Sequence, residues 1–362
     1  MAKIAYEYLV VGGGIAGVTA AETIREKHPT ATIAIVSDEP HLLYSRVLIP
    51  SYLKRRISRD KLFLRRAEDF TGKGIDLHLV QRVVFVDTKQ RFISLESGLS
   101  FRFQKLLLAS GGKVKPWGEE KYQKLILRMQ TLDDADRIMA ILPSLRHPVV
   151  VGSSFIGLEF LEIFSLQNLH PAILTHDTHY FAKFLDPLGG EIIRNNFARN
   201  GIESYFQDSV RDIRVREGEL LVGTARLREI SCDVLGAAVG IQRNTDFLSG
   251  SGIELGQVGI RTNEFLETNV EDVYAAGDVA EFFDTVAGKF RAAGNWTNGF
   301  LQGMKAGLNM AGSREPYRNV SAYSITNLGL QITVLGEYAP DMDTIVRIDE
   351  LNDQYERIFL KD

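Results

Sequence analysis

The chain has 362 residues, of which 45% are hydrophobic and 24% charged, and its formal net charge is −4 at pH 7. The length predicts two or three domains with ample core, and the acidic balance argues against a nucleic-acid-binding role for the whole molecule. No apolar run approaches the ~20 residues of a membrane-spanning helix, and no signal peptide precedes the first predicted strand. We therefore expect a cytoplasmic protein without a membrane span.

The first predicted strand leads into a glycine motif of the form G-x-G-x-x-G. Gly12 permits a tight turn, Gly14 lets backbone approach a pyrophosphate, and Gly17 lets the following helix pack on the strand. The N-terminus of that helix offers N–H groups and a positive dipole end to phosphates. The next strand, over residues 31–36, leads to Glu39, where a carboxylate can bind a ribose hydroxyl. This order of elements predicts a dinucleotide site.

A basic run extends from Lys54 to Arg66. It holds seven cations against one acid, Asp60, in a chain that is net acidic. One interpretation is a solvated face of the protein. The other is a docking patch for an acidic protein partner, because complementary charge accelerates encounter.

Residues 75–107 alternate apolar and polar side chains, with a turn at Gly98, which predicts a small antiparallel sheet inserted in the first domain. A buried strand then ends in the small residues Ala109, Ser110 and Gly111, where backbone can approach a cofactor. Thr131 is expected to cap a helix whose first turn is acidic.

A second glycine motif lies 140 residues after the first. Gly152 and Gly157 hold its outer positions, and Ser154 replaces the middle glycine, adding bulk but also a hydroxyl that could donate to phosphate. The strand predicted over residues 172–175 has no carboxylate at its tip, although Asp177 follows. The absence of a nearby Lys or Arg favours NAD over NADP. A domain that keeps the fold but binds no nicotinamide remains the alternative.

Cys232 is the single cysteine of the chain, so a dithiol relay between flavin and a disulfide substrate is excluded. We expect it to be a buried structural thiol, which also fits a reducing compartment. His176 and His179 flank Asp177, but no third ligand is evident, so no metal site is predicted.

The last third of the chain contains three further predicted elements. A strand ends in Gly277-Asp278, and a helix follows over residues 296–310, with Gly303 and Gly307 on one face for close packing. Residues 344–360 read as a β-hairpin that must pack on something, because two strands alone are marginal.

Together these motifs resemble the FAD-dependent pyridine-nucleotide oxidoreductases, and within them the chain is most similar to NADH:rubredoxin reductases, ferredoxin reductases and the flavin domains of nitrite reductases. The resemblance extends from Tyr8 to about Glu337. It implies an α/β fold with two Rossmann-like dinucleotide-binding domains, which are three-layered with parallel sheets and an inserted antiparallel sheet. A short truncated C-terminal β region is expected to follow these two domains. The expected domains are residues 1–112 with 245–315 for FAD, 113–244 for NAD(P), and 316–362 as a short C-terminal domain.

The resemblance also implies roles for particular residues. FAD is expected at Gly12, Gly14, Gly17, Glu39, Arg46, Val83, Ala109, Ser110, Gly111, Gly277, Asp278 and Trp296. NAD(H), with NADP(H) as an alternative, is expected at Gly152, Ser154, Gly157, Glu159, Asp177 and Gly240. Two of these residues are expected to be catalytic: Arg46, in the segment Tyr44-Ser45-Arg46, places a cation near the flavin ring, and Glu159 faces the nicotinamide.

The sequence departs from the family pattern in three places. Arg243-Asn244 replaces the usual Pro-Asn, which unsettles the loop expected on the NAD side. The acid that reads the NAD ribose is absent, and the C-terminal domain is shorter than the family's, which puts the usual dimer in doubt.

The leading functional hypothesis is an NAD(P)H:acceptor oxidoreductase that passes hydride to FAD and electrons to an acidic carrier such as rubredoxin or ferredoxin at the basic run. A flavin-binding subunit or redox-dependent interaction protein with little turnover is the alternative. Reduction of oxygen or a small ion is a third hypothesis. The sequence leaves open the acceptor, the choice between NADH and NADPH, and the oligomeric state.

Overall fold

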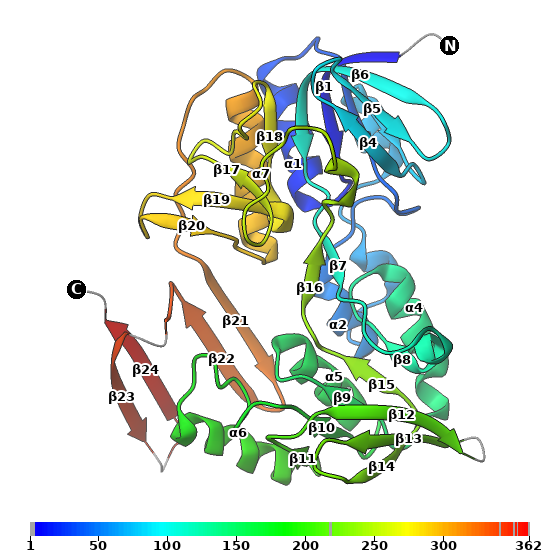
Figure 1. Cartoon of the computed structure of the whole chain (residues 1–362), viewed down its shortest axis with the longest axis vertical. Coiled ribbons are helices and arrows are strands. Elements are labelled where there is room, and N and C mark those ends of the chain that lie inside the picture. The colour runs from blue at the N-terminus through cyan, green and yellow to red at the C-terminus, as the bar shows by residue number, and fades with distance from the viewer. Residues whose placement is uncertain (1–3, 217–218, 340–341, 350–351, 353, 361–362) are drawn as a thin grey trace. The chain divides into compact units, whose positions relative to one another are not determined.

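The computed structural model describes residues 4–216, 219–339, 342–349, 352 and 354–360, and the chain forms two compact units. Unit 1 comprises Met1–Leu48, Ser58–Lys113 and Ile241–Asn319, and unit 2 comprises Ile49–Ile57, Val114–Gly240 and Val320–Asp362. Each unit has a parallel sheet of its own (Figure 1). None of the helices in the described ranges is long and apolar enough to cross a membrane.

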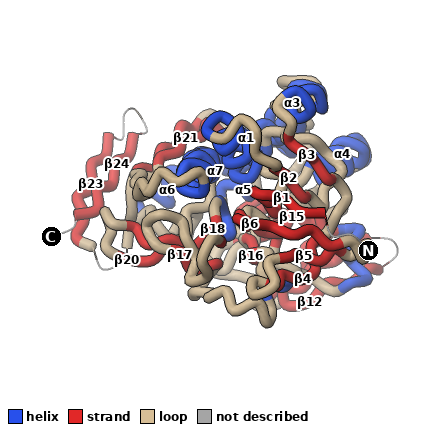
Figure 2. Tube along the Cα trace, turned by 90° about the horizontal axis from the view of Figure 1, so that it is seen from above, coloured by secondary structure: helices blue, strands red, loops and turns tan. Residues whose placement is uncertain are grey.

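The main sheet of unit 1 has the strand order β3-β2-β1-β6-β5-β4, with β18 also paired to β6. Figure 2 shows β3, β2, β1 and β6 side by side. The strands are β1 (Ile4–Val11), β2 (Ile33–Val36), β3 (Ile75–His78), β4 (Val83–Asp87), β5 (Phe92–Leu95), β6 (Ser100–Leu108) and β18 (Val273–Ala275).

The antiparallel insertion differs from the expected one over residues 75–107. Strand β3 runs parallel to β2, because helix α3 (Ala67–Gly72) precedes it as part of a crossover connection. Only β4, β5 and the first part of β6 pair antiparallel, with a turn at Gly98, and β6 continues into the parallel sheet beside β1. The insertion is therefore an extension of the main sheet.

Two helices of unit 1 pack with very close backbones, namely α1 (Ile15–Lys27) and α7 (Trp296–Met310). A Cβ on Gly303 would lie 2.3 Å from the carbonyl oxygen of Ala16, and one on Gly307 would lie 2.7 Å from that of Ala20. Side chains at these two positions would separate the helices, so the predicted packing role of both glycines is confirmed.

The smaller elements of unit 1 surround this core. A second sheet has the order β17-β19-β20, and β7 pairs with β16. Their bounds are β7 (Gly112–Val114), β16 (Ile241–Arg243), β17 (Ile260–Thr262), β19 (Ala280–Asp284) and β20 (Lys289–Arg291), with short 3-10 turns η1 (Arg46–Leu48), η2 (Arg59–Leu62), η5 (Asp246–Leu248) and η6 (Gly277–Val279).

Unit 2 contains a five-stranded parallel sheet of order β11-β10-β9-β15-β8 and an antiparallel meander β12-β13-β14. The strands are β8 (Ile126–Leu127), β9 (Val149–Val151), β10 (Ala172–Leu174), β11 (Glu203–Tyr205), β12 (Val210–Arg216), β13 (Glu219–Thr224), β14 (Glu229–Cys232) and β15 (Leu235–Ala237). The helical segments are α2 (Ile49–Leu53), η3 (Glu120–Leu125), α4 (Leu132–Ile141), η4 (Leu142–Ser144), α5 (Phe155–Leu166) and α6 (Pro187–Arg199).

Two local predictions are confirmed in unit 2. Thr131 caps α4, since its hydroxyl accepts the N–H of Asp134 at 3.1 Å while the Asp134 carboxylate accepts the N–H of Thr131 at 3.0 Å. Cys232 is buried at the end of β14, and burial raises the pKa of its thiol to about 12. Its thiol therefore stays protonated at neutral pH, as expected of a structural cysteine.

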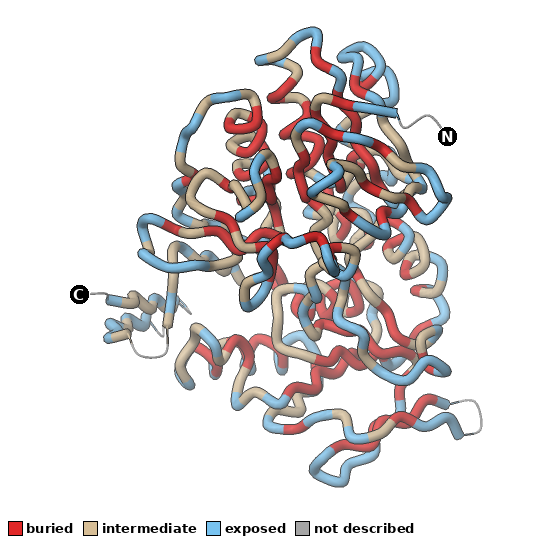
Figure 3. The backbone as a smooth tube through the Cα atoms, turned by 45° about the horizontal axis from the view of Figure 1, so that its top comes forward, coloured by how far each residue is buried: buried red, intermediate tan, exposed pale blue. Residues whose placement is uncertain are grey.

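Two hairpins complete the described part of unit 2, β21 (Ala322–Asn327) with β22 (Leu330–Leu335), and β23 (Asp343–Asp349) with β24 (Gln354–Leu360). The second is the hairpin predicted over residues 344–360. Figure 3 shows the end of the chain, beside the C label, as mostly exposed or half-buried. Aromatic contacts hold the hairpins: Tyr323 packs edge-on against Phe155, and Tyr338 contacts Phe359.

Candidate functional site

The glycine loop of unit 1 leaves β1 and enters α1. Gly12 has a φ of +121°, and a Cβ there would lie 2.1 Å from the carbonyl oxygen of Ala109, so a side chain is excluded. Gly14 is extended, with a φ of −77°, and nothing lies within 4 Å of a Cβ built on it. The α1 N-terminus has no side-chain cap. This loop therefore combines open space beside Gly14 with uncapped N–H groups at the start of α1.

The glycine loop of unit 2 repeats this geometry between β9 and α5. Gly152 has a φ of +103°. The N–H of Gly12 donates to the Val36 carbonyl at 2.8 Å, and the N–H of Gly152 donates to the Leu174 carbonyl at 3.0 Å. The two loops are therefore the same turn at the same point of two equivalent strand pairs.

A carboxylate stands three residues beyond the second strand of each unit. Strand β2 ends at Val36 and Glu39 follows it, whereas β10 ends at Leu174 and Asp177 follows it. Val36 and Leu174 each lie opposite the last residue of the first strand, so the two registers agree. Asp177 therefore holds the position in unit 2 that Glu39 holds in unit 1, which the sequence pattern did not show because the predicted strand was one residue too long.

The hydroxyl of Ser154 is committed within unit 2. It accepts the N–H of Gly157 at 3.4 Å, capping α5, and donates to the carbonyl of Ala238 at 3.2 Å. The predicted contact of this hydroxyl with a phosphate would therefore have to replace its hydrogen bond to Ala238. The neighbouring Ser153 hydroxyl donates instead to Asp177.

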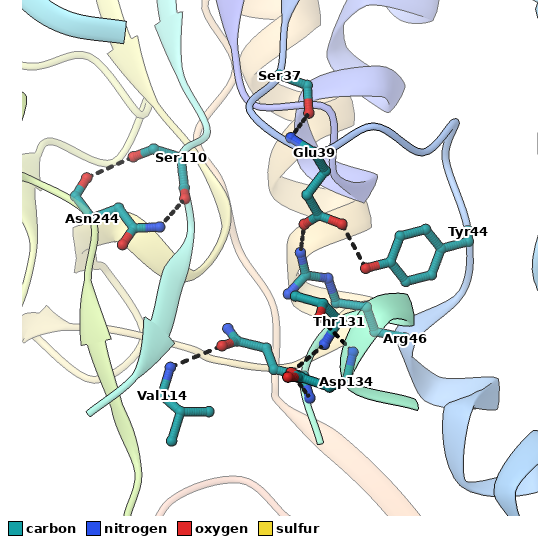
Figure 4. Close-up of polar contacts among 10 residues, drawn as sticks. Ser37, Glu39, Tyr44, Arg46, Ser110, Val114, Thr131, Asp134 and Asn244 are labelled. Carbon is teal, nitrogen blue, oxygen red and sulfur yellow. Dashed lines mark hydrogen bonds and ion pairs between the residues drawn. The ribbon is translucent and has the colours of Figure 1, made fainter. Parts of the chain in front are cut away.

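In unit 1, Glu39 lies in a network of side chains (Figure 4). The Tyr44 hydroxyl donates to it at 2.7 Å, and the Arg46 guanidinium forms an ion pair with its other oxygen. Its backbone N–H donates to Ser37 Oγ at 3.3 Å. The structure thus joins two residues, Glu39 and Arg46, for which the resemblance implies different parts of FAD.

The end of β6 is fixed by Asn244, the residue after β16 (Figure 4). Ser110 Oγ donates to the Asn244 carbonyl at 2.8 Å, and Asn244 Nδ2 donates to the Ser110 carbonyl at 2.9 Å. The Asn244 N–H also donates to Gly111 at 3.0 Å. Arg243-Asn244 therefore belongs to unit 1, which corrects its expected place on the NAD side, because β16 pairs with the strand that directly follows Gly111.

Asp278 follows β18, and its preceding residue anchors the turn. The N–H of Gly277 donates to the buried Gln302 side chain at 2.8 Å, which ties the turn to α7. Burial raises the pKa of the Asp278 carboxyl, while the guanidinium groups of Arg243 and Arg46 act in the opposite direction. Asp278, Gly277 and Arg46, all predicted for FAD, thus gather in unit 1 together with Arg243, which the sequence did not single out as a ligand.

A cavity of about 510 Å³ opens in unit 1 beside the predicted ribose acid. It is lined by Asp38, Val80, Gln81, Arg82, Glu96 and Ser97. Val83, predicted for FAD, follows Arg82 of the cavity lining and is buried at the start of β4. The N–H of Val80 donates to the Glu39 carbonyl at 3.4 Å, and Val80 has a φ of +55°, a strained conformation for a β-branched residue. No sequence pattern marks Val80, because only non-local pairing imposes that conformation.

Glu159, predicted for the nicotinamide, lies in the first turns of α5 and is paired with a buried lysine. Lys54 Nζ lies 2.6 Å from its carboxylate, and the same ammonium contacts Glu162. The Lys54 side chain is only 4% exposed. Arg56 adds a weaker contact to Glu162 at 3.5 Å. Sequence reasoning missed both Glu162 and the burial of Lys54.

The equivalent helix of unit 1, α1, also carries a glutamate that is paired with basic side chains. Glu22 lies five residues after Gly17, just as Glu162 lies five residues after Gly157. Arg65 binds Glu22 with two hydrogen bonds, of 2.7 and 2.8 Å, and Lys73 lies 2.6 Å from it. The equal spacing after the two glycine motifs was the available signal. The basic run therefore supplies internal partners to both helices.

The remaining predicted residues lie at the ends of elements. Trp296 is the first residue of α7, after the capping residue Asn295. Gly240 follows β15 with a φ of +85°, and its carbonyl accepts the N–H of Lys115 at 3.0 Å. Across the part of the chain that the structure describes, no cluster of three or more His, Cys, Asp or Glu is placed to hold a metal ion.

The residues present in unit 1 fit a dinucleotide. The space beside Gly14 and the uncapped α1 suit a diphosphate, and Glu39 supplies an acceptor for ribose hydroxyls. Asp278 is a half-buried carboxylate without a hydrogen bond from a described residue, and Arg243 Nε is a buried donor in the same condition. These two groups fit a ligand that offers both hydroxyl groups and anionic oxygens.

Comparison with known proteins gives consistent relatives. The chain is 28% identical over 344 residues to apoptosis-inducing factor 3 of Mus musculus, covering 93% of this chain but 56% of the relative, so it spans little more than half of that protein. It is 26% identical over 360 residues to the NADH-rubredoxin oxidoreductase of Clostridium acetobutylicum, covering 98% of this chain and 88% of the relative. The crystal structure of a ferredoxin reductase from Rhodopseudomonas palustris matches with a TM-score of 0.91 at 22% identity, over 98% of this chain and 88% of that one.

The structural match confirms the predicted α/β fold, since at that identity it bears on the fold alone. The family model for pyridine nucleotide-disulphide oxidoreductases matches residues 6–303, which include both glycine loops. That match confirms the predicted family, for which binding of both FAD and a pyridine nucleotide was expected. The chain belongs to the pyridine nucleotide-disulphide oxidoreductase family.

Proposed function

We propose that this chain is a flavoprotein oxidoreductase that takes hydride from NAD(P)H onto FAD and passes electrons to an acceptor protein of the rubredoxin or ferredoxin kind. One observation carries the proposal: the two glycine loops share one backbone geometry, and each has a carboxylate three residues past its second strand. The name of the clostridial relative, which the chain covers to 88%, supports the choice of acceptor. The single buried cysteine leaves no dithiol to act as a relay.

In this proposal unit 1 holds FAD and unit 2 holds the pyridine nucleotide. The FAD diphosphate lies along Gly12, Gly14 and Gly17 at the α1 N-terminus. Glu39 accepts hydroxyls of one ribose, and Asp278 those of the ribityl chain. The further FAD residues proposed are Val83, Ala109, Ser110, Gly111, Gly277 and Trp296. The predicted boundary at residue 112 and the C-terminal domain from residue 316 remain part of this proposal, with Arg243 and Asn244 on the FAD side.

The proposed chemistry needs position and charge from the protein. When bound, FAD accepts a hydride from the nicotinamide and releases electrons one at a time. Arg46 supplies positive charge toward the flavin ring once Glu39 is engaged by ribose. Glu159 orients the nicotinamide amide and is itself held by Lys54, whose ammonium lies 2.6 Å away. Gly152, Ser154, Gly157 and Gly240 shape the nucleotide loop.

We propose NADH as the preferred donor. Asp177 occupies the ribose position in unit 2, and no Lys or Arg occurs between residues 171 and 182 to pair with a 2′-phosphate. Asp177→Asn should lower the NADH preference about tenfold, since a charged hydrogen bond is lost. The measure is the ratio of flavin reduction rates with NADH and NADPH in stopped flow, with Thr178→Ala, at a neighbouring exposed residue, as the control.

The direct test of the proposed function is anaerobic mixing of the purified protein with NADH. We expect a yellow protein with one noncovalent FAD per chain that bleaches on mixing and then reduces an acidic carrier. A protein that binds FAD but does not bleach would instead support the alternative, a flavin-binding subunit with little turnover. A cytoplasmic location stays part of this proposal, since a lone cysteine fits a reducing compartment.

The acceptor-docking surface in this proposal is the exposed part of the basic run. Lys54, Arg56 and Arg65 are occupied by Glu159, Glu162 and Glu22. Within unit 1, Lys61 and Arg66 remain exposed. These two cations would steer an acidic carrier, an attraction that salt screens with a Debye length of about 10 Å at 0.1 M.

The double variant Lys61→Glu/Arg66→Glu should slow carrier reduction and flatten its salt dependence without changing the rate of flavin reduction by NADH. The matched control reverses two other exposed cations of unit 1, Lys89 and Arg102. Equal carrier rates and equal salt slopes for both double variants would show that the basic run is only a solvated face and does not dock the carrier.

A further inference from the structure

Arg243 is a charged side chain that the fold of unit 1 leaves unused. It is only half-exposed at the end of β16, and its Nε is buried without a hydrogen-bond partner among the described residues. A buried, unsatisfied donor on a guanidinium costs free energy unless something binds it. No contact within the described structure explains why an arginine stands at this position.

The side chains of Arg243 and Asp278 both reach the same point beside Gly294. From the point where a Cβ on Gly294 would lie, Asp278 Oδ1 is 3.7 Å away and Arg243 Nη2 is 3.8 Å away. No ion pair within 4 Å joins the two charged groups in the described structure. An arginine and an aspartate that face the same space without pairing form a site with a donor side and an acceptor side.

The backbone that carries Arg243 is held firmly. Asn244, the next residue, makes three hydrogen bonds of 2.8 to 3.0 Å with Ser110 and Gly111. Both of these residues belong to the strand end proposed for FAD. The guanidinium is thus directed from a fixed base, and binding it costs little backbone ordering.

We propose that Arg243 is a direct ligand of FAD, with its guanidinium on an anionic oxygen of the dinucleotide while Asp278 accepts neighbouring hydroxyls. This inference rests on the proposed function, because it needs FAD in unit 1. Guanidinium forms strong paired hydrogen bonds with phosphate oxygens and binds other planar anionic groups equally well. FAD offers two such anions, the diphosphate and the reduced flavin ring.

Three variants test the inference: Arg243→Met, which keeps much of the side-chain length, Arg243→Lys, which keeps the charge, and the control Arg91→Met. Arg91 is an arginine of the same unit that pairs with Asp272 at 3.1 Å. The flavin-free proteins are titrated with FAD, followed by flavin fluorescence, and the midpoint potential of each loaded protein is then measured. Circular dichroism checks that the variants are folded.

We expect Arg243→Met to weaken FAD binding about 10- to 100-fold, the effect of losing a charge-assisted hydrogen bond, and Arg243→Lys to recover part of it. If the contact is to the diphosphate, the midpoint potential stays unchanged, because oxidised and reduced FAD lose affinity equally. If it is to the reduced ring, the potential falls as well.

Folded Arg243→Met protein with the FAD affinity and potential of wild type and of Arg91→Met would overturn the inference. Wild-type protein that binds no FAD would instead overturn the proposed function, so the two failures are distinguishable.

Discussion

The two glycine loops differ in what they do before any ligand binds. In unit 1, Gly14 faces open space and α1 is uncapped. In unit 2, Ser154 caps α5 with its own hydroxyl, and Ser153 engages Asp177. The first loop leaves its donors and its space for a ligand, whereas the second satisfies part of its own polar groups. This difference suits a tightly held cofactor in unit 1 and an exchanging one in unit 2.

The helices that follow the two loops differ in how deeply their charge pairs are buried, and here unit 2 has the more buried pair. Glu22 on α1 is bound by Arg65 and Lys73, which are 36% and 43% exposed. Glu162 on α5 shares with Glu159 a lysine that is 4% exposed. Charge pairs in solvent contribute little, while a buried pair becomes costly once one partner is removed. The glutamate–cation pair is therefore expected to contribute little to the stability of unit 1 and to matter more for the stability of unit 2.

The largest expected effect follows from that contrast. Lys54→Met leaves two carboxylates in unit 2 without their buried partner and should lower the free energy of unfolding by about 3–5 kcal/mol. Urea denaturation followed by circular dichroism measures it. The matched change Lys73→Met in unit 1, where Glu22 keeps Arg65, should cost less than about 1 kcal/mol. Similar losses for both would remove the distinction between the two helices.

The next effect tests the open space of unit 1. Gly14→Val should weaken FAD binding at least ~100-fold, because a branched side chain occupies the place of the diphosphate. The flavin-free protein should keep its melting temperature, since nothing lies near that Cβ. Gly72→Val, another glycine with open space around its Cβ, is the control and should retain FAD. A fully flavin-loaded Gly14→Val protein would contradict the assignment of this loop.

A smaller effect is expected at Asp278 of unit 1. Because burial raises the folded-state pKa of Asp278 above its unfolded value, the folded protein binds the proton more tightly. The contribution of this carboxyl to stability is therefore fully present below its unfolded pKa and is lost as pH rises through its folded pKa. Asp278→Asn should stabilise the flavin-free protein at pH 7 by about 1 kcal/mol while weakening FAD binding.

Thermal melts of flavin-free wild type and Asp278→Asn at pH 7 and near pH 4 measure this difference, which should shrink at the lower pH. A difference that is independent of pH would show that the carboxyl is not the source of the effect.

The smallest expected effect lies in the loop of unit 2. Ser154→Gly recreates the glycine pattern of unit 1 but removes a helix cap, and should cost only a few tenths of a kcal/mol, whereas Ser154→Ala should cost about 1 kcal/mol. Both variants should be reduced by NADH within about twofold of wild type, because the hydroxyl is bound internally. A large rate loss in both would place this hydroxyl on the nucleotide.

Several features followed from the sequence because they depend on neighbours along the chain. The glycine turns at Gly12 and Gly152, the cap at Thr131 and the final hairpin all arise from backbone and side-chain chemistry within a few residues. The family followed as well, since the spacing of two glycine motifs and of Gly277-Asp278 is a linear pattern.

Other features required the tertiary structure. Strand β3 alternates like an antiparallel strand but pairs parallel to β2. Asp177 matches the position of Glu39 only because β10 ends at Leu174. The burial of Lys54 between two glutamates and the meeting of Arg243 with Asp278 join residues far apart in the chain.

The sequence by itself therefore determined the type of each nucleotide loop and the family to which the chain belongs. The tertiary structure decided which charged side chains are paired within the described protein and which are left to bind a ligand. The physical reason is that turn and cap preferences are local, whereas strand register and charge burial depend on which distant segments pack together.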